Sequence, residues 1–117
     1  MKTNKIIFWI ATGLLSAMML MSAGMYVFNN AEIQPVFVGL GFPTWIMYPL
    51  AFLKVSGVLV ITISKWKTVK EWAYAGFFFD FLLAIGAHVS IGDGEQFGAI
   101  IALTLLIVSY VFRKRLA

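Results

Sequence analysis

Residues 70–90 read KEWAYAGFFFDFLLAIGAHVS, and this stretch decides what kind of protein the chain is. Its apolar run is long enough to supply the ~20 helical residues that cross a bilayer core of ~30 Å. The run nevertheless holds Asp80 near its middle and His88 near its end. Because a charge is costly inside lipid, an acid at this depth is expected to face protein and to mark a functional or register-fixing site.

The composition of the whole chain agrees with this stretch. Of its 117 residues, 62% are hydrophobic and 12% are charged, and that charged share is roughly half the share in a soluble domain. We therefore expect one membrane-embedded domain over residues 1–117. The chain has no cysteine and one histidine. Thiolate metal sites, iron–sulfur clusters and disulfides are excluded, and no metal site is expected within a single copy.

Four apolar stretches predict an all-α membrane protein, a bundle of four transmembrane helices. They cover residues 6–28, 45–64, 72–91 and 97–112. The last stretch is short for a span, so it would use flanking residues or local thinning of the bilayer. The first stretch resembles a signal peptide, but its apolar run is longer than the usual ~7–15 residues, which favours its retention as a span.

The connections between these stretches alternate in charge. Both chain ends and residues 65–71 (KWKTVKE) are basic, whereas residues 29–44 carry Glu32 and no base, and residues 92–96 (GDGEQ) carry only acids. The positive-inside rule then places both termini and the second connection in the cytoplasm of a multi-pass membrane protein. The net charge of +4 follows from this topology, so no nucleic-acid partner is expected.

The first connection is not an ordinary loop. Its VFVGLGF segment is apolar but too short to span, and Pro35 and Pro43 disfavour a continuous helix. We expect a short interfacial half-helix between the first two spans. A hydrophobic loop among the headgroups is the alternative.

Small side chains predict the packing faces, because helices in lipid associate where small residues let backbones approach. On the third span the small stripe runs through Ala73, Gly76, Asp80, Ala84 and Ala87. The rings of Phe78, Phe79 and Phe81 would then point to lipid. The stripes of the other spans contain Gly13, Ala17, Leu20 and Gly24; Ala51, Lys54, Gly57 and Val58; and Gly98, Ala102, Leu105 and Ser109.

Lys54 is the only charge of the second span. At ~1.5 Å per residue its depth differs from that of Asp80 by only ~3 Å. Consecutive antiparallel spans are neighbours, so we expect a Lys54–Asp80 ion pair that serves either function or helix register. His88 falls toward the outer interface, where it is either a solvated histidine or a proton relay beside Asp80. We expect Glu32 and Gln34 to face the same vestibule on the outer side.

Three runs of the sequence carry a resemblance to a known family. They are PLAFLKVSGVLVI at 49–61, KEWAYAGFFFDFLLAIGAH at 70–88 and GDG at 92–94, and FWIATGLL at 8–15 and LGFPTWIMYP at 40–49 agree with them. Together they resemble the DoxX-like family of small bacterial membrane proteins. The resemblance implies a four-helix membrane protein from a group that includes subunits of a thiosulfate:quinone oxidoreductase and a membrane partner in a thiol-oxidative-stress complex.

The resemblance also selects positions, without implying a catalytic role for any of them. The patterned positions fall on Lys54, Gly57, Glu71, Trp72, Tyr74, Gly76, Asp80 and His88. Glu71 and Tyr74 thereby become secondary site candidates beside Lys54, Asp80 and His88. Without cysteine, any thiol exchange would reside in a partner.

Three function classes fit these residues. In the first, Lys54, Asp80 and His88 line a cavity of a redox-linked membrane subunit, where a quinone binds and an acid and an imidazole supply its protons. The redox centre would then belong to a partner subunit, and no enzyme activity is expected of this chain alone. The second is a small proton-coupled transporter or permeation subunit. The third is an assembly or interaction protein, or a homo-oligomer, whose basic segments meet anionic lipid or a partner.

Overall fold

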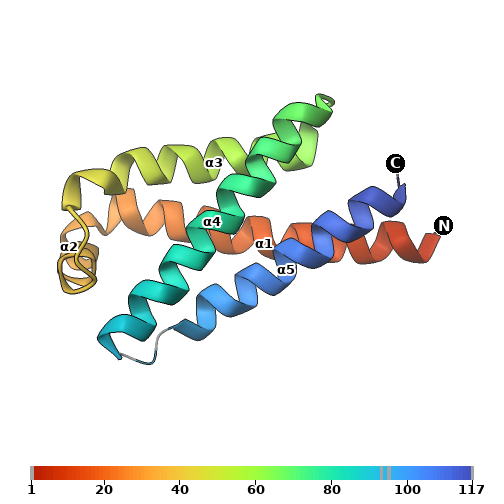
Figure 1. Ribbon diagram of the computed structural model, residues 1–117. Helices are drawn as coiled ribbons and strands as arrows, with labels where there is room; N and C mark the ends of the chain where they lie inside the picture. Colours follow the sequence, from red (N-terminus) through yellow and green to blue (C-terminus); the bar gives the residue numbers. More distant parts are fainter. Residues whose placement is uncertain (1, 93, 95, 117) are drawn as a thin grey trace.

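Figure 1 shows the computed structural model of the chain, which describes residues 2–92, 94 and 96–116. The long helices are α1 (Lys2–Phe28), α3 (Met47–Ile63), α4 (Lys67–Ile91) and α5 (Gln96–Leu116). Helix α2 (Asn30–Gly39) and the 3-10 turn η1 (Thr44–Ile46) connect α1 to α3. All four long helices are long and apolar enough to span a membrane, α3 together with η1. The four-span, all-α prediction is confirmed, while Asp93 and Glu95 of the predicted acidic turn lie outside the described residues.

The four long helices form a bundle in which chain neighbours are also spatial neighbours. Helix α1 packs against α3 and α5, and α4 packs against the same two helices. Both termini and the α3–α4 connection lie at one end, whereas α2 and the α4–α5 connection lie at the other (Figure 1). We call these the basic end and the α2 end. The molecule is 45 Å long, which matches a bilayer with its headgroups.

Helix α5 is longer than the sequence predicted. It has 21 residues and continues through Arg113, Lys114 and Arg115, so it is about 31 Å long. Basic side chains stabilise the last turn of a helix, because the carbonyl groups there give the helix end a partial negative charge. Of the two expectations for the short fourth stretch, the use of flanking residues is confirmed, because the helix begins at Gln96 and continues past residue 112, and no thinned bilayer is needed.

The half-helix between the first two spans is confirmed as α2. Asn30 donates from Nδ2 to the Tyr26 carbonyl oxygen over 2.9 Å, and the Tyr26 and Phe37 rings meet edge to face at 5.1 Å. Pro35 lies inside this helix without breaking it. After the helix, Gly41 takes a φ of 86°, a left-handed conformation that glycine adopts without strain.

The core is built from large side chains more than from small ones. Leu15 and Met19 of α1 pack with Val58 and Ile61 of α3, and the rest of the cluster comes from α4 and α5. Its members on those two helices are Tyr74, Phe77, Phe81, Ala102 and Leu106.

Two details of the predicted packing faces were wrong. Phe81 is only 3% exposed, although Phe79 does point outward as expected. On α1, Thr12, Ser16 and Ala23 are buried in place of the predicted Gly13, Ala17 and Gly24. The helix is thus rotated by one residue, or about 100°. Large rings are needed because α3 and α4 diverge from their connection (Figure 1), and small residues cannot fill the widening gap.

At Gly57 the α3 backbone lies against the Phe77 ring of α4. A methyl group at this position would overlap the Phe77 ring. We predict that Gly57→Ala lowers the free energy of unfolding by about 1–3 kcal/mol, because an overfilled core must shift. Gly13→Ala is the matched control, since nothing lies within 4 Å of the added methyl group. Denaturant titration in one detergent compares the two, and equal stabilities would show that the ring moves aside freely.

The topology is testable because the chain has no native thiol. We predict that cysteines introduced at the exposed positions Ala31 and Thr68 react with an impermeant maleimide from opposite sides of the membrane. Thr68→Cys should be protected in intact cells and labelled after lysis, whereas Ala31→Cys should be labelled in both. Labelling of both from one side contradicts the four-span topology.

Candidate ligand groove and vestibule

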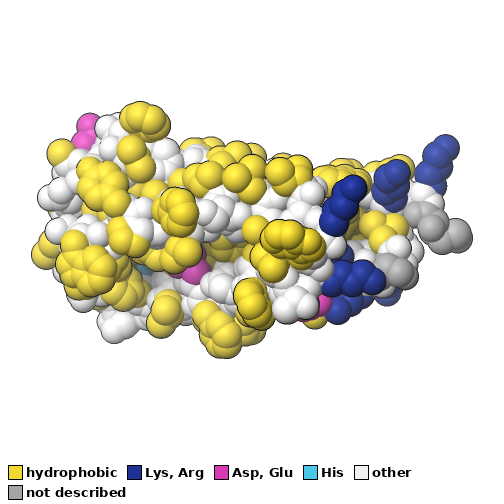
Figure 2. All heavy atoms as spheres, turned by 90° about the horizontal axis from the view of Figure 1, so that it is seen from above, with side chains coloured by type: hydrophobic (Ala, Val, Ile, Leu, Met, Phe, Trp, Pro, Cys, Tyr) yellow, Lys and Arg dark blue, Asp and Glu magenta, His cyan; other side chains and the backbone are white. Residues whose placement is uncertain are grey.

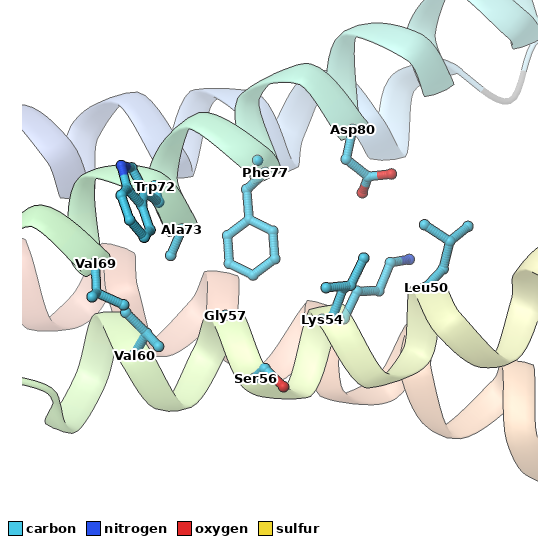
Figure 3. A pocket seen from close by; sticks show the side chains of 12 residues that line it. Leu50, Lys54, Ser56, Gly57, Val60, Val69, Trp72, Ala73, Phe77 and Asp80 are labelled. Atoms are coloured by element: carbon cyan, nitrogen blue, oxygen red, sulfur yellow. The ribbon is translucent and has the colours of Figure 1, made fainter.

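A groove of about 330 Å³ lies between α3 and α4. Its walls are mainly apolar and include Leu53, Val60, Trp72 and Phe77. Trp72 and Leu53 are largely exposed at the surface of the bundle, so the groove is open beside them. Lys54 and Asp80 are the two charged residues that line it, and Figure 3 shows them projecting from facing helices into one space. A molecule with an apolar body and a polar end matches this lining.

Lys54 is buried, with 6% of its surface exposed. Its Nζ donates to Ser22 Oγ over 2.6 Å and to the Tyr26 hydroxyl over 3.0 Å. The same nitrogen lies 4.2 Å from the centre of the Tyr26 ring, where the negative face of the ring attracts a cation. Helix α1 therefore supplies the groups that keep this charge inside the bundle.

The predicted Lys54–Asp80 ion pair is not formed. The two groups interact electrostatically across the groove, but in the described part of the chain the hydrogen-bond partners of Lys54 are Ser22 and Tyr26. The physical reason is that α3 and α4 diverge here, while the α1 hydroxyls lie beside the ammonium. Sequence reasoning missed both partners. Their signal was the four-residue spacing, which puts Ser22 and Tyr26 on one helix face.

Asp80 also lines a second cavity, which we call the vestibule. This vestibule has a volume of about 280 Å³ and lies beneath α2, where Phe37 and Leu40 cover it. Asp80 and Leu50 line both cavities. His88 lines the vestibule from α4, about 12 Å beyond Asp80 along the helix axis. Asp80 is thus the ionisable residue common to the two cavities.

The acid and amide of α2 do not join this site. Glu32 and Gln34 are exposed, and Gln34 Nε2 donates to Asn30 Oδ1 on its own helix. The α2 side chains that line the vestibule are apolar, among them Ile33 and Phe37. The expectation that Glu32 and Gln34 face the vestibule was wrong, because the helix turns its apolar face inward.

Glu71 joins α4 to α5 at the basic end. Tyr110 donates its hydroxyl to Oε2 over 2.8 Å, and Arg113 Nη1 donates to Oε1 over 2.9 Å. Lys114 Nζ lies 2.6 Å from the same Oε1. This carboxylate is fully engaged by neighbouring helix α5 and lies outside the groove.

Tyr74 is buried in a hydroxyl network that crosses the bundle. Ser109 Oγ lies 2.7 Å from the Tyr74 hydroxyl and 2.6 Å from Thr12 Oγ1. The three side chains come from α4, α5 and α1, so each polar group finds a partner away from lipid. The patterned positions Glu71 and Tyr74 thus have helix-joining contacts, whereas Lys54 and Asp80 line the groove.

The sequence profile of the DoxX-like family matches residues 10–111. The chain belongs to the DoxX-like family. The match begins in α1 and ends in α5, so it covers all four spans of this membrane protein and confirms the resemblance seen in the sequence. Comparisons with curated proteins and with solved structures gave no match.

A double-mutant cycle can measure how strongly Lys54 interacts with each of its neighbours. We predict a coupling of about 1.5–3 kcal/mol between Lys54→Met and Tyr26→Phe, because the pair shares a hydrogen bond to a charged group. The coupling between Lys54→Met and Asp80→Asn should be clearly smaller. Unfolding free energies measured in one detergent give both values. If the coupling to Asp80 is larger than the coupling to Tyr26, Lys54 forms the ion pair that the sequence predicted.

Proposed function

We propose that this DoxX-like protein is a membrane subunit that binds a quinone in the α3–α4 groove and delivers protons to it from the vestibule. One observation carries the proposal: Asp80 lines both cavities, so one carboxyl group meets the groove on one side and the vestibule on the other.

The groove offers complementary chemistry to the two ends of a quinone. Its apolar walls and lipid-side opening suit an isoprenoid tail that enters from the bilayer. The rings of Trp72 and Phe77 are available to the quinone ring. An ammonium group has three N–H donors, and two of those of Lys54 are used by Ser22 and Tyr26. The third can donate to a quinone carbonyl oxygen.

The proton route begins at His88. Quinone reduction consumes two protons and two electrons, and an imidazole followed by a carboxyl group in the vestibule lining supplies a stepwise path for the protons. With ~12 Å between the two residues along α4, water in the vestibule would bridge them. The sequence has no cysteine, and the electrons are assigned to a partner subunit that carries the redox centre. The resemblance to small bacterial membrane proteins suggests the bacterial inner membrane, and the charge placement favours a basic end that lies in the cytoplasm.

A proton-coupled transporter or permeation subunit is the second candidate. It is favoured by the combined extent of the two cavities along α4, from His88 near the α2 end to Val69 near the basic end. Charged groups within a span often mark such pathways. The two candidates differ in whether a quinone is retained and whether protons cross the membrane.

The quinone proposal predicts quenching of tryptophan fluorescence by a short-chain quinone in nanodiscs. Trp72 lines the groove, so Trp72→Phe should remove most of the saturable quenching. Lys54→Met should weaken binding about tenfold, because the quinone carbonyl loses a hydrogen bond from a charged donor. Glu32→Gln removes a carboxylate that lines neither cavity and should leave the affinity unchanged.

Three outcomes would contradict the proposal. They are the absence of saturable quenching in the folded protein, quenching that survives Trp72→Phe, and equal effects of the Lys54 and Glu32 variants. If no quinone binds and a pH dye in proteoliposomes reports flux that Asp80→Asn abolishes, the transporter candidate replaces the quinone subunit.

A further inference from the structure

The basic end of the bundle contains a cavity separate from the groove. We call it the basic basin, and its volume is about 530 Å³. Its lining brings together cations from α1, the α3–α4 connection, α4 and α5: Lys5, Lys65, Lys67, Lys70, Arg113 and Lys114. Figure 2 shows the Lys and Arg side chains gathered at this end, while hydrophobic side chains cover much of the length.

The positive charge of the basin is not neutralised by the protein. Glu71 is its one acidic lining residue, and Arg113 and Lys114 already engage that carboxylate. In the part of the chain that the structure describes, Lys5, Lys65, Lys67 and Lys70 form no ion pair. Lys70 and Arg113 are also close enough to repel each other. Such clustering is unfavourable by itself and becomes favourable when an anion enters.

We propose that the basic basin is a binding site for the phosphate headgroup of an anionic lipid. The positive-inside rule alone requires basic residues at this end but not their convergence on one cavity. The chemistry of the remaining lining favours a lipid over a soluble anion, because Phe8, Trp9 and Leu116 place apolar surface beside the cations. Trp9 is about half exposed, and tryptophan prefers the depth of the headgroups.

The geometry suits a headgroup with two phosphates better than one with a single phosphate. The cations come from four parts of the bundle and surround a volume larger than the groove. Basic pockets between spans on the cytoplasmic side bind such headgroups in other membrane proteins. An occupied basin would hold α1, α4 and α5 together at their ends, independently of whether the groove binds a quinone.

The test compares two pairs of substitutions that remove the same charge. Lys67→Gln with Lys70→Gln takes two cations from the basin. Lys2→Gln with Arg115→Gln takes two exposed cations from the same end that do not line it. Native mass spectrometry of the purified full-length chain measures retention of tetraoleoyl cardiolipin, dioleoyl phosphatidylglycerol and dioleoyl phosphatidylcholine.

We expect cardiolipin to bind more tightly than phosphatidylglycerol, and phosphatidylcholine to bind weakly. The basin pair should reduce cardiolipin affinity at least tenfold, and the control pair less than twofold. Lys67→Arg with Lys70→Arg should restore binding, which separates lost charge from lost folding. If both glutamine pairs lose the same cardiolipin affinity, the lipid is attracted by the surface charge in general and not by the basin, and the proposal is overturned. Inorganic pyrophosphate is added as a competitor. If its affinity for the basin equals that of cardiolipin, the lipid assignment is overturned.

Discussion

The ammonium group of Lys54 must be solvated inside the bundle, and much of the structure around it follows from this requirement. A lone charge at the centre of a span costs ~2.5–3.5 kcal/mol on insertion scales. The protein meets that cost with hydroxyl and aromatic groups of α1, namely Ser22 and Tyr26. Because those groups lie on α1, the carboxylate of Asp80 on α4 is not consumed by an ion pair. It stays at the junction of the groove and the vestibule.

The same rule, that polar groups find partners within the protein, explains how the other helices are joined. The Tyr74–Ser109–Thr12 network links α4, α5 and α1 in the core. At the basic end, Glu71 ties α4 to Arg113 of α5. These contacts use the buried and half-buried polar side chains that apolar packing alone cannot satisfy. They join α4 to α5 through polar contacts, whereas α3 and α4 meet through apolar contacts such as that of the Phe77 ring with Gly57 and diverge with distance from their connection (Figure 1).

This unequal packing creates the cavities on which the proposed functions rest. The α3–α4 side opens into an apolar groove, with one cation and one carboxylate at the same level. At the far end, apolar side chains of α2 line the vestibule together with Asp80 and His88 of α4. The basic basin at the opposite end belongs to a different set of residues. A lipid bound there would contact none of the residues that line the groove, and the two sites can therefore be tested separately.

The sequence by itself determined the class, the number of spans and the clustering of charge. Long apolar stretches in lipid must form helices, because only then are their backbone N–H and C=O groups hydrogen-bonded. The lengths of these stretches and the alternating charge of the connections are visible in the sequence itself. It also singled out Lys54, Asp80 and His88, because ionisable residues are rare within spans. Tertiary structure alone decided what these residues contact. The rotation of α1 that brings Ser22 and Tyr26 to Lys54, and the divergence of α3 and α4 that separates Lys54 from Asp80, depend on how large side chains such as Phe81 fill the core. Side-chain volume is shared among all the helices, so the pattern of any one span cannot fix these arrangements.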